Sequence, residues 1–320
     1  MNPIIPISDP DSLRITFRGV RGSTPTPGSG TLRYGGNTAC IELRAGSSIL
    51  ILDAGTGIRV LGSDLQTEFG EQPLDATILI SHTHWDHIQG LPFFSPGFRS
   101  RNRIRVMAPR GKGPLLLRAL QNQMDPLHFP VGLNLMDGLK GVEEFNSDLV
   151  QIGSMQVRVA SLNHPGGCSG FRVETGGGSL AYLPDHEPYH RGQGRISRER
   201  TDALLEFISG VDLLILDTQY TEAEYPARSG WGHGCLLDSV SMAVQADVRR
   251  LSLFHHDPTH DDRQIDAMVL RARELSAQSG LLVEGAAENQ TIVLSRASAP
   301  LRPTPLPAVE SLQGLKTLHS

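Results

Sequence analysis

The sequence predicts an α+β protein with a single domain, in which packed sheets are covered by outer helices. Apolar runs of strand length recur between Gly and Pro residues, and segments with helical spacing lie between several of them. The early segments are dense in strands and rich in glycine, which argues against a plain alternation of strands and helices. A chain of 320 residues allows one large domain or two small ones, and no linker divides this one.

The expected strands are short apolar runs with turn residues beside them, at 13–17, 48–53, 76–81, 104–108, 155–160, 180–183, 211–217, 251–255 and 291–294. Three amphipathic helices are expected at 197–208, 236–246 and 263–278. The first is predicted to begin at Ser197, a good N-cap residue, and to end before Gly210, a good C-cap residue.

Both ends of the chain differ from the predicted domain at 12–296. Residues 1–11 are expected to form an N-terminal extension. Residues 297–320 contain four prolines and show no periodicity, which is typical of an extended or loosely docked appendage.

Composition excludes several classes of protein. The formal net charge is −5, which gives no general attraction to polyanions, so no long nucleic acid is expected as a partner. Three cysteines do not make a disulfide framework, and the first residues do not have the pattern of a secretory signal. No apolar run is long enough to span a membrane. We therefore expect a cytoplasmic protein without a membrane partner.

The strongest chemical signal is the run SHTHWDH at residues 81–87, which directly follows an expected strand. Neutral imidazoles and carboxylates are preferred ligands of zinc and similar ions. The spacing lets His82 and His84 face one side of the loop while Asp86 and His87 face another, so that two ions could share it. An incidental polar turn is a poor explanation for four ligand-type residues within six positions.

Three later strands also end in ligand-type residues. His164 follows one of them, Asp185 the next, and the pair His255 and His256 the last. Each residue alone would more often be a helix cap or a solvated side chain. Together with the 81–87 run, they would complete two coordination spheres.

With these residues, the chain resembles the metallo-β-lactamase superfamily over about residues 13–294. The resemblance implies an αββα four-layer sandwich with two metal ions at one edge, a hydroxide held between them, and Asp185 as the bridging ligand. The implied ligands are His82, His84 and His164 for one ion, and Asp86, His87 and His255 for the other. Asp86 would also take part in catalysis. We expect His255 rather than His256 as the last ligand, and zinc as the metal, with manganese or iron(II) as alternatives.

Residues 211–236 indicate a branch of this superfamily. VDLLILDTQY, followed by GWGHGC and a helix, resembles the ribonuclease Z-like branch. In that branch an acid at the position of Asp217 orients a histidine at the position of His233, which protonates the leaving oxygen of a phosphodiester. The HST signature of the branch reads HGC here. The loop LDAGTGIR also resembles the branch, and Asp53 is expected to hold a ligand histidine.

The spacing of the motifs favours a small substrate. Only 21 positions separate His164 from Asp185, too few for the long arm that binds tRNA in tRNA-processing members. We therefore expect a dinuclear phosphodiesterase for a small-molecule phosphodiester, with cyclic nucleotides first and cyclic ribose phosphates next. The alternatives are a lactone or thioester hydrolase, a tRNA 3′-processing endonuclease, and a metal-bound sensor without turnover. A homodimer is compatible with each of them.

Overall fold

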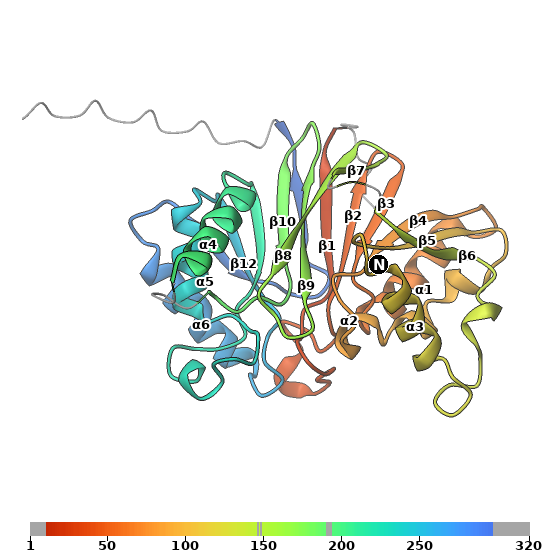
Figure 1. The fold of residues 1–320 in the computed structure, drawn as a ribbon, viewed down its shortest axis with the longest axis horizontal. Coiled ribbons are helices and arrows are strands. Elements are labelled where there is room, and N and C mark those ends of the chain that lie inside the picture. Colours follow the sequence, from red (N-terminus) through yellow and green to blue (C-terminus); the bar gives the residue numbers. More distant parts are fainter. Residues whose placement is uncertain (1–10, 146, 148, 190–193, 297–320) are drawn as a thin grey trace, which may run out of the picture.

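Four layers make up the fold (Figure 1). In the residues that the computed structural model describes, 11–145, 147, 149–189 and 194–296, two seven-stranded sheets lie face to face and helices cover both outer faces. The α+β class and the αββα layering predicted from the sequence are therefore confirmed. Residues 1–10 of the expected extension and all of the expected tail at 297–320 lie outside the described residues.

The first sheet has the order β14-β1-β2-β3-β4-β5-β6. Neighbours are antiparallel from β14 to β3 and parallel from β3 to β6. Because the carboxyl ends of parallel strands meet at one edge, the loops after β3 and β4 lie together there. The strands are β1 (Leu13–Gly19), β2 (Cys40–Ala45), β3 (Ser48–Leu52), β4 (Asp75–Leu79), β5 (Arg103–Ala108), β6 (Leu139–Glu144) and β14 (Thr291–Leu294).

The second sheet has the order β13-β12-β11-β10-β9-β8-β7. Its neighbours are parallel from β13 to β10 and antiparallel from β10 to β7. The loops after β10, β11 and β12 therefore also meet at one edge. The strands are β7 (Leu149–Ile152), β8 (Met155–Leu162), β9 (Cys168–Glu174), β10 (Ser179–Leu183), β11 (Leu213–Asp217), β12 (Arg250–Phe254) and β13 (Leu282–Gly285).

The helices separate into two outer layers (Figure 1). One layer contains α1 (Gly57–Phe69), α2 (Trp85–Ile88) and α3 (Gly113–Gln123), and the other contains α4 (Gly194–Ile208), α5 (Leu236–Gln245) and α6 (Asp262–Leu275). No helix in the described part of the chain is long and apolar enough to cross a membrane. Short 3₁₀ turns complete the structure: η1 (Ser29–Thr31), η2 (Leu91–Phe93), η3 (Ser95–Phe98), η4 (Leu133–Leu135) and η5 (Tyr225–Ala227).

Three apolar clusters hold these layers together. The central cluster fills the space between the sheets and includes Phe17 and Phe171. A second cluster, with Leu61 and Leu120, lies under the first helical layer, and a third, with Val240, lies under the other. Complete burial of one such side chain contributes about 1.5–3 kcal/mol, so these layers fix the sheet edges that carry the site.

Several elements were not predicted from the sequence. The missed strands are β2, β6, β7, β9 and β13, and the missed helices include α1 and α3. One predicted boundary is wrong, because α4 begins at Gly194 and Ser197 therefore lies within the helix instead of capping it. β2 lacks an obvious strand pattern because it carries Glu42, a buried charge paired with Arg18 and Arg44.

Two residues at strand ends have left-handed backbone conformations. Asp53 after β3 has φ 61° and His255 after β12 has φ 59°, which is uncommon for residues other than glycine. Gly22 packs against His255, and a Cβ atom at Gly22 would lie 2.4 Å from the His255 ring. These conformations turn both side chains into the edge where the loops meet, and strain of this kind is typical of functional sites.

Candidate metal centre and active site

Strand ends from both sheets deliver the residues singled out in the sequence to one edge of the sandwich. The loop after β4 carries the SHTHWDH run, and α2 begins within that run at Trp85. The ends of β8, β10, β11 and β12 deliver His164, Asp185, Asp217 and His255. Residues separated by up to 173 positions in the sequence thus meet in one place.

The predicted ligand residues form two clusters of donor atoms. His82, His84, His164 and Asp185 make one cluster, whose donor atoms all lie within 4.8 Å of one another, and Asp86, His87 and His255 make the other. Asp185 lies between them. Its Oδ2 atom is 3.6 Å from Nε2 of both His82 and His164, and its Oδ1 atom is 3.0 Å from Nε2 of His87.

The chemistry of these atoms fits two divalent cations. Nε2 of His82, Nε2 of His87 and Oδ1 of Asp185 are buried without a hydrogen-bond partner in the described part of the chain. Unpaired buried polar atoms are costly, and a cation between them would remove that cost. Burial also holds the pKa of His82 well below its usual range, so its imidazole is neutral, which is the form that binds metals. Nitrogen and carboxylate donors of this kind suit zinc, manganese or iron(II).

Partners on the second ring nitrogen orient two of the candidate ligands. Nδ1 of His87 donates to Oδ2 of Asp53 at 2.8 Å, as the aspartate loop predicted. Asp53 also accepts from the Tyr182 hydroxyl at 2.8 Å. Nδ1 of His164 donates to the carbonyl of Gly232 at 2.8 Å. These contacts leave Nε2 of both histidines with a lone pair directed into the clusters.

Gln219 orients His255 in the same way, and sequence reasoning missed this residue. The Nε2 atom of Gln219 donates to Oδ2 of Asp257 at 3.1 Å, since a carboxylate can only accept. The amide oxygen therefore faces Nδ1 of His255, at 3.0 Å, and this nitrogen must carry the hydrogen. Nε2 of His255 is then free for a cation, and it lies 3.1 Å from Oδ2 of Asp86.

Glu187 is a second residue that sequence reasoning missed. Its carboxylate accepts hydrogen bonds from the backbone N–H groups of Gly230 and Gly232 and from the Tyr225 hydroxyl. It thereby fixes the turn that holds His164 and leads into His233. Its position two residues after Asp185 is the one local signal that could have drawn attention to it.

Asp217 and His233 form a hydrogen-bonded pair beside the clusters. Nδ1 of His233 donates to Oδ2 of Asp217 at 2.9 Å, and its ring stacks on His255 with centroids 4.9 Å apart. Burial opposes protonation of His233, but the charge and the hydrogen bond of Asp217 outweigh it and raise the pKa to about 9. Asp217 is fully buried and also accepts from the backbone N–H of His186 at 3.1 Å. Asp217 therefore stabilises the protonated form of His233.

Three buried histidines in the described part of the chain, His186, His256 and His260, lie outside the two clusters. Nε2 of His256 donates to the carbonyl of Ala286 at 2.9 Å, which places its ring away from the donor atoms that His255 joins. His186 accepts from the backbone of Asn163, and His260 contacts Glu224 at 2.9 Å. Both of these histidines are buried.

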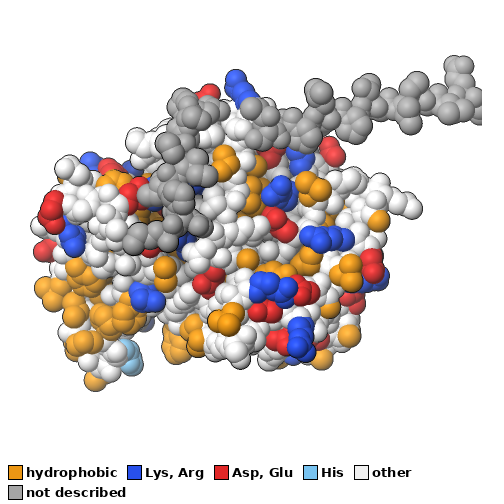
Figure 2. Space-filling model, turned by 180° about the vertical axis from the view of Figure 1, so that it is seen from behind, with side chains coloured by type: hydrophobic (Ala, Val, Ile, Leu, Met, Phe, Trp, Pro, Cys, Tyr) orange, Lys and Arg blue, Asp and Glu red, His pale blue; other side chains and the backbone are white. Residues whose placement is uncertain are grey.

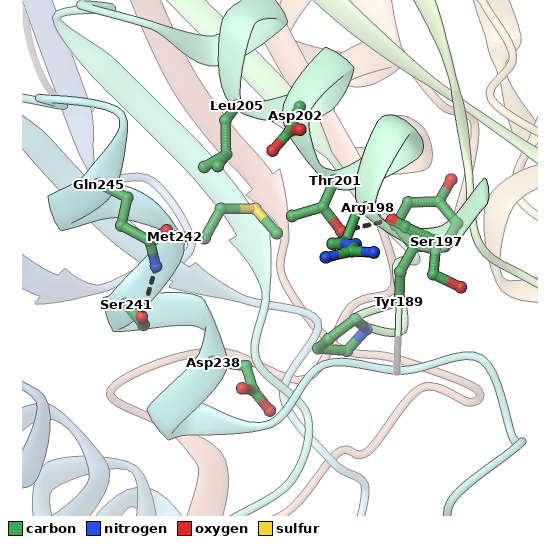
Figure 3. Close-up of a pocket in the computed structure, with 11 residues that line it drawn as sticks. Tyr189, Ser197, Arg198, Thr201, Asp202, Leu205, Asp238, Ser241, Met242 and Gln245 are labelled. Carbon is green, nitrogen blue, oxygen red and sulfur yellow. Dashed lines mark hydrogen bonds between the residues drawn. The ribbon is translucent and has the colours of Figure 1, made fainter. Parts of the chain in front are cut away.

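A cavity of about 310 Å³ lies between α4 and α5 (Figure 3). Tyr189, Arg198 and Met242 are among the residues that line it. None of the seven predicted metal ligands borders this cavity, so it is separate from the candidate metal centre.

Comparison with known protein families shows the family to which the chain belongs. A model described as the beta-lactamase superfamily domain matches residues 49–256, a range that includes every residue of both donor clusters. The chain belongs to this superfamily. Together with the donor clusters, membership makes it a metal-dependent hydrolase with the metallo-β-lactamase fold.

Curated relatives cover most of the chain at low identity. Ribonuclease Z of Natronomonas pharaonis is 26% identical, and the match covers 80% of this chain and 92% of that protein. Ribonuclease Z of Thermoplasma acidophilum is 24% identical, covering 79% and 89%. The uncharacterized protein Rv1339 of Mycobacterium tuberculosis is 28% identical, covering 77% and 82%. The chain is thus similar to ribonuclease Z proteins along almost their whole length.

Solved structures support the same fold. The metallo-β-lactamase fold protein YhfI of Bacillus subtilis has a TM-score of 0.63 at 18% identity, covering 88% of this chain and 99% of that one. Yeast PDE1 has a TM-score of 0.61 at 16% identity, covering 88% and 99%. The short form of human tRNase Z has a TM-score of 0.58 at 19% identity, covering 87% and 98%.

Proposed function

We propose that this hydrolase is a dinuclear phosphodiesterase for a small substrate, with a cyclic nucleotide as the first candidate. The observation that carries the proposal is the contact of 2.9 Å between His233 and Asp217, next to both donor clusters. Breaking a phosphodiester requires a proton for the leaving oxygen, whereas an acyl hydrolase has less need of such a donor. Relatives named ribonuclease Z and a structural neighbour named PDE1 agree with chemistry on phosphodiesters.

The proposed metal ligands are those expected from the sequence. His82, His84 and His164 would hold one ion, and Asp86, His87 and His255 the other, with Asp185 shared between them. Two bound dications would acidify water to supply the nucleophile and would neutralise charge on the phosphoryl oxygens. Zinc is the proposed metal, with manganese and iron(II) as alternatives.

His233 would deliver its proton from Nε2. Its Nδ1 atom is committed to Asp217, so the opposite ring nitrogen is the one available to a substrate. Asp217 keeps its orientation because the backbone N–H of Gln219 donates to Oδ1 at 3.1 Å, and that of His186 donates to Oδ2. The pair therefore holds a proton at a fixed atom, ready for a departing alkoxide.

The surface favours a small substrate over a long nucleic acid. On the face drawn in Figure 2, Lys and Arg side chains alternate with Asp and Glu instead of forming a continuous basic surface. The net charge of −5 also gives no general attraction to a polyanion. The connection between His164 and Asp185 consists of β9 and β10 with short loops, which leaves no room for an arm.

A substrate panel tests this proposal. With zinc or manganese bound, we expect turnover of cyclic mononucleotides or cyclic ribose phosphates, and much slower turnover of lactones and thioesters. The measurement is the kcat/KM value for each compound. Preferential turnover of a lactone or a thioester would contradict the proposal.

Cleavage of precursor tRNA is the second candidate function, because several relatives carry the name ribonuclease Z. We expect little cleavage of precursor tRNA, since binding a long polyanion requires many phosphate contacts and depends steeply on salt. Cleavage assays from low to physiological salt measure this. Efficient cleavage that falls steeply as salt rises would favour the tRNA function over the small substrate.

Gln219 should control metal affinity. Replacing it with leucine would remove the amide oxygen that fixes the hydrogen on Nδ1 of His255, and we expect zinc affinity to fall by about 10- to 100-fold. Equilibrium dialysis measures the change. Gln156→Leu, at an exposed position of β8, is the matched control, for which affinity should not change. Equal affinities in Gln219→Leu and wild type would show that His255 does not depend on this contact.

A further inference from the structure

The chain has two tryptophans, and both are exposed next to the candidate metal centre. The exposed fraction is 79% for Trp85 and 60% for Trp231. Tryptophan is usually well buried, because its large ring gains much from leaving water. Two exposed rings beside one reaction centre therefore call for an explanation.

Each tryptophan is close in sequence to His84 or to a residue that contacts His164, and these two histidines are candidate ligands of the same ion. Trp85 is the first residue of α2 and lies in sequence between His84 and Asp86. Trp231 precedes Gly232, whose carbonyl accepts from Nδ1 of His164. Nε2 of His164 lies 3.0 Å from Nδ1 of His84, so these two histidines form a pair. Trp85 directly follows one member of the pair, and Trp231 directly precedes the glycine that contacts the other.

The same side of the centre is the one open to solvent. His84 is exposed, whereas Asp86, His87 and His255 of the other cluster are buried. The turn that carries Trp231 packs tightly against His164, since a Cβ atom at Gly232 would lie 2.4 Å from its Nδ1 atom. Both tryptophans therefore flank, along the backbone, the histidine pair on the solvent-exposed side of the centre.

A cationic side chain lies near the same histidine pair. Lys112, just before α3, donates from Nζ to the carbonyl of Gly167 at 3.2 Å. Gly167 belongs to the loop after His164, and a Cβ atom at the neighbouring Gly166 would lie 3.9 Å from Nε2 of His84. An ammonium group thus lies beside the loop that contacts the same histidine pair.

We propose that Trp85 and Trp231 form a subsite that stacks the nucleobase of a nucleotide substrate, with Lys112 attracting its phosphate. This inference rests on the proposed phosphodiesterase function and specifies a substrate that carries a base, rather than a bare cyclic ribose phosphate. Flat aromatic rings bind any base through its π-face, and an alkyl or acyl substrate would gain little from them. The subsite would thus select nucleotides as a class without selecting one base.

Binding without turnover provides the first test. Trp85→Phe and Trp231→Phe each leave one tryptophan, whose fluorescence reports on its own surroundings. Titrating the zinc-loaded variants with adenosine monophosphate should give a saturable change in both, and ribose 5-phosphate should give a much smaller one. If neither variant responds to adenosine monophosphate more than to ribose 5-phosphate, the subsite does not exist.

Turnover provides the second test. In Trp85→Ala and Trp231→Ala, the ratio of kcat/KM for cyclic AMP to that for a cyclic ribose phosphate should fall by about 10- to 100-fold, mainly through KM. Trp→Phe should restore most of the ratio, because phenylalanine keeps a flat ring. Leu270→Ala on the exposed face of α6 is the control, with an unchanged ratio expected.

The two proposals fail in different ways. Equal losses for both substrates in the alanine variants would overturn the stacking subsite and leave the phosphodiesterase intact. Fluorescence changes specific to adenosine monophosphate, with no hydrolysis of any cyclic diester, would support the subsite and overturn the phosphodiesterase.

Discussion

Asp185→Ala is expected to lower turnover at least about 10³-fold and to release at least one of two bound metal ions. Asp185 is the carboxylate that approaches both donor clusters, with Oδ2 3.6 Å from His82 and Oδ1 3.0 Å from His87. Its removal would leave three histidines for one ion and would take away the charge that keeps two dications close together. Elemental analysis and kcat measured on the same preparation give both quantities.

A milder variant separates loss of the bridge from loss of the fold. Asp185→Asn keeps the volume and one oxygen but removes the charge, so we expect a folded protein that still loses metal. Asp75→Asn, at the exposed start of β4, is the control and should keep both ions. If the fully active wild-type protein held one tightly bound ion, the dinuclear centre itself would be contradicted.

His233→Ala is expected to slow hydrolysis of a natural diester by about 10² to 10⁴-fold. A sugar alkoxide is a poor leaving group near neutral pH and needs the proton that Asp217 holds on His233. A nitrophenyl diester should be slowed much less, because nitrophenolate leaves without a proton. The ratio of the two rates therefore measures the contribution of a general acid.

Asp217→Asn should show a weaker form of the same pattern, because an amide positions the ring less firmly than a carboxylate does. Metal content should stay unchanged in both variants. Equal slowing of the two diesters with intact metals would show that His233 is not the acid. Loss of a metal would instead identify His233 as a ligand, which its position near Asp185 and His255 allows geometrically.

Much of the site was predictable because its chemistry is concentrated in short motifs. The SHTHWDH run is local in sequence, and the later residues stand directly after apolar strands, so the shared sheet edge follows from parallel pairing. The contact between Asp53 and His87 was also expected, and it is present.

The missed parts depend on contacts over long distances in the sequence. Gln219 matters because its amide oxygen contacts His255, which lies 36 positions away in the sequence. Nothing in the residues around a glutamine indicates such a contact. Glu187 matters because it accepts from Gly230 and Gly232, more than 40 positions away. The edge strands β6 and β7 escaped notice because their residues are half exposed and lack the apolar core that marks a central strand.

The pairing of β14 with β1 has a consequence for protein synthesis. Leu13 lies opposite Leu294, so one edge of β1 keeps unpaired backbone groups until residues 291–294 have been synthesised. Unpaired edges invite aggregation. The candidate ligands of the SHTHWDH run are also synthesised long before His255, which completes their donor cluster. Closure of this sheet edge therefore waits for residues 291–294, completion of the second donor cluster waits for His255, and a chain truncated before residue 291 would leave this edge of β1 open.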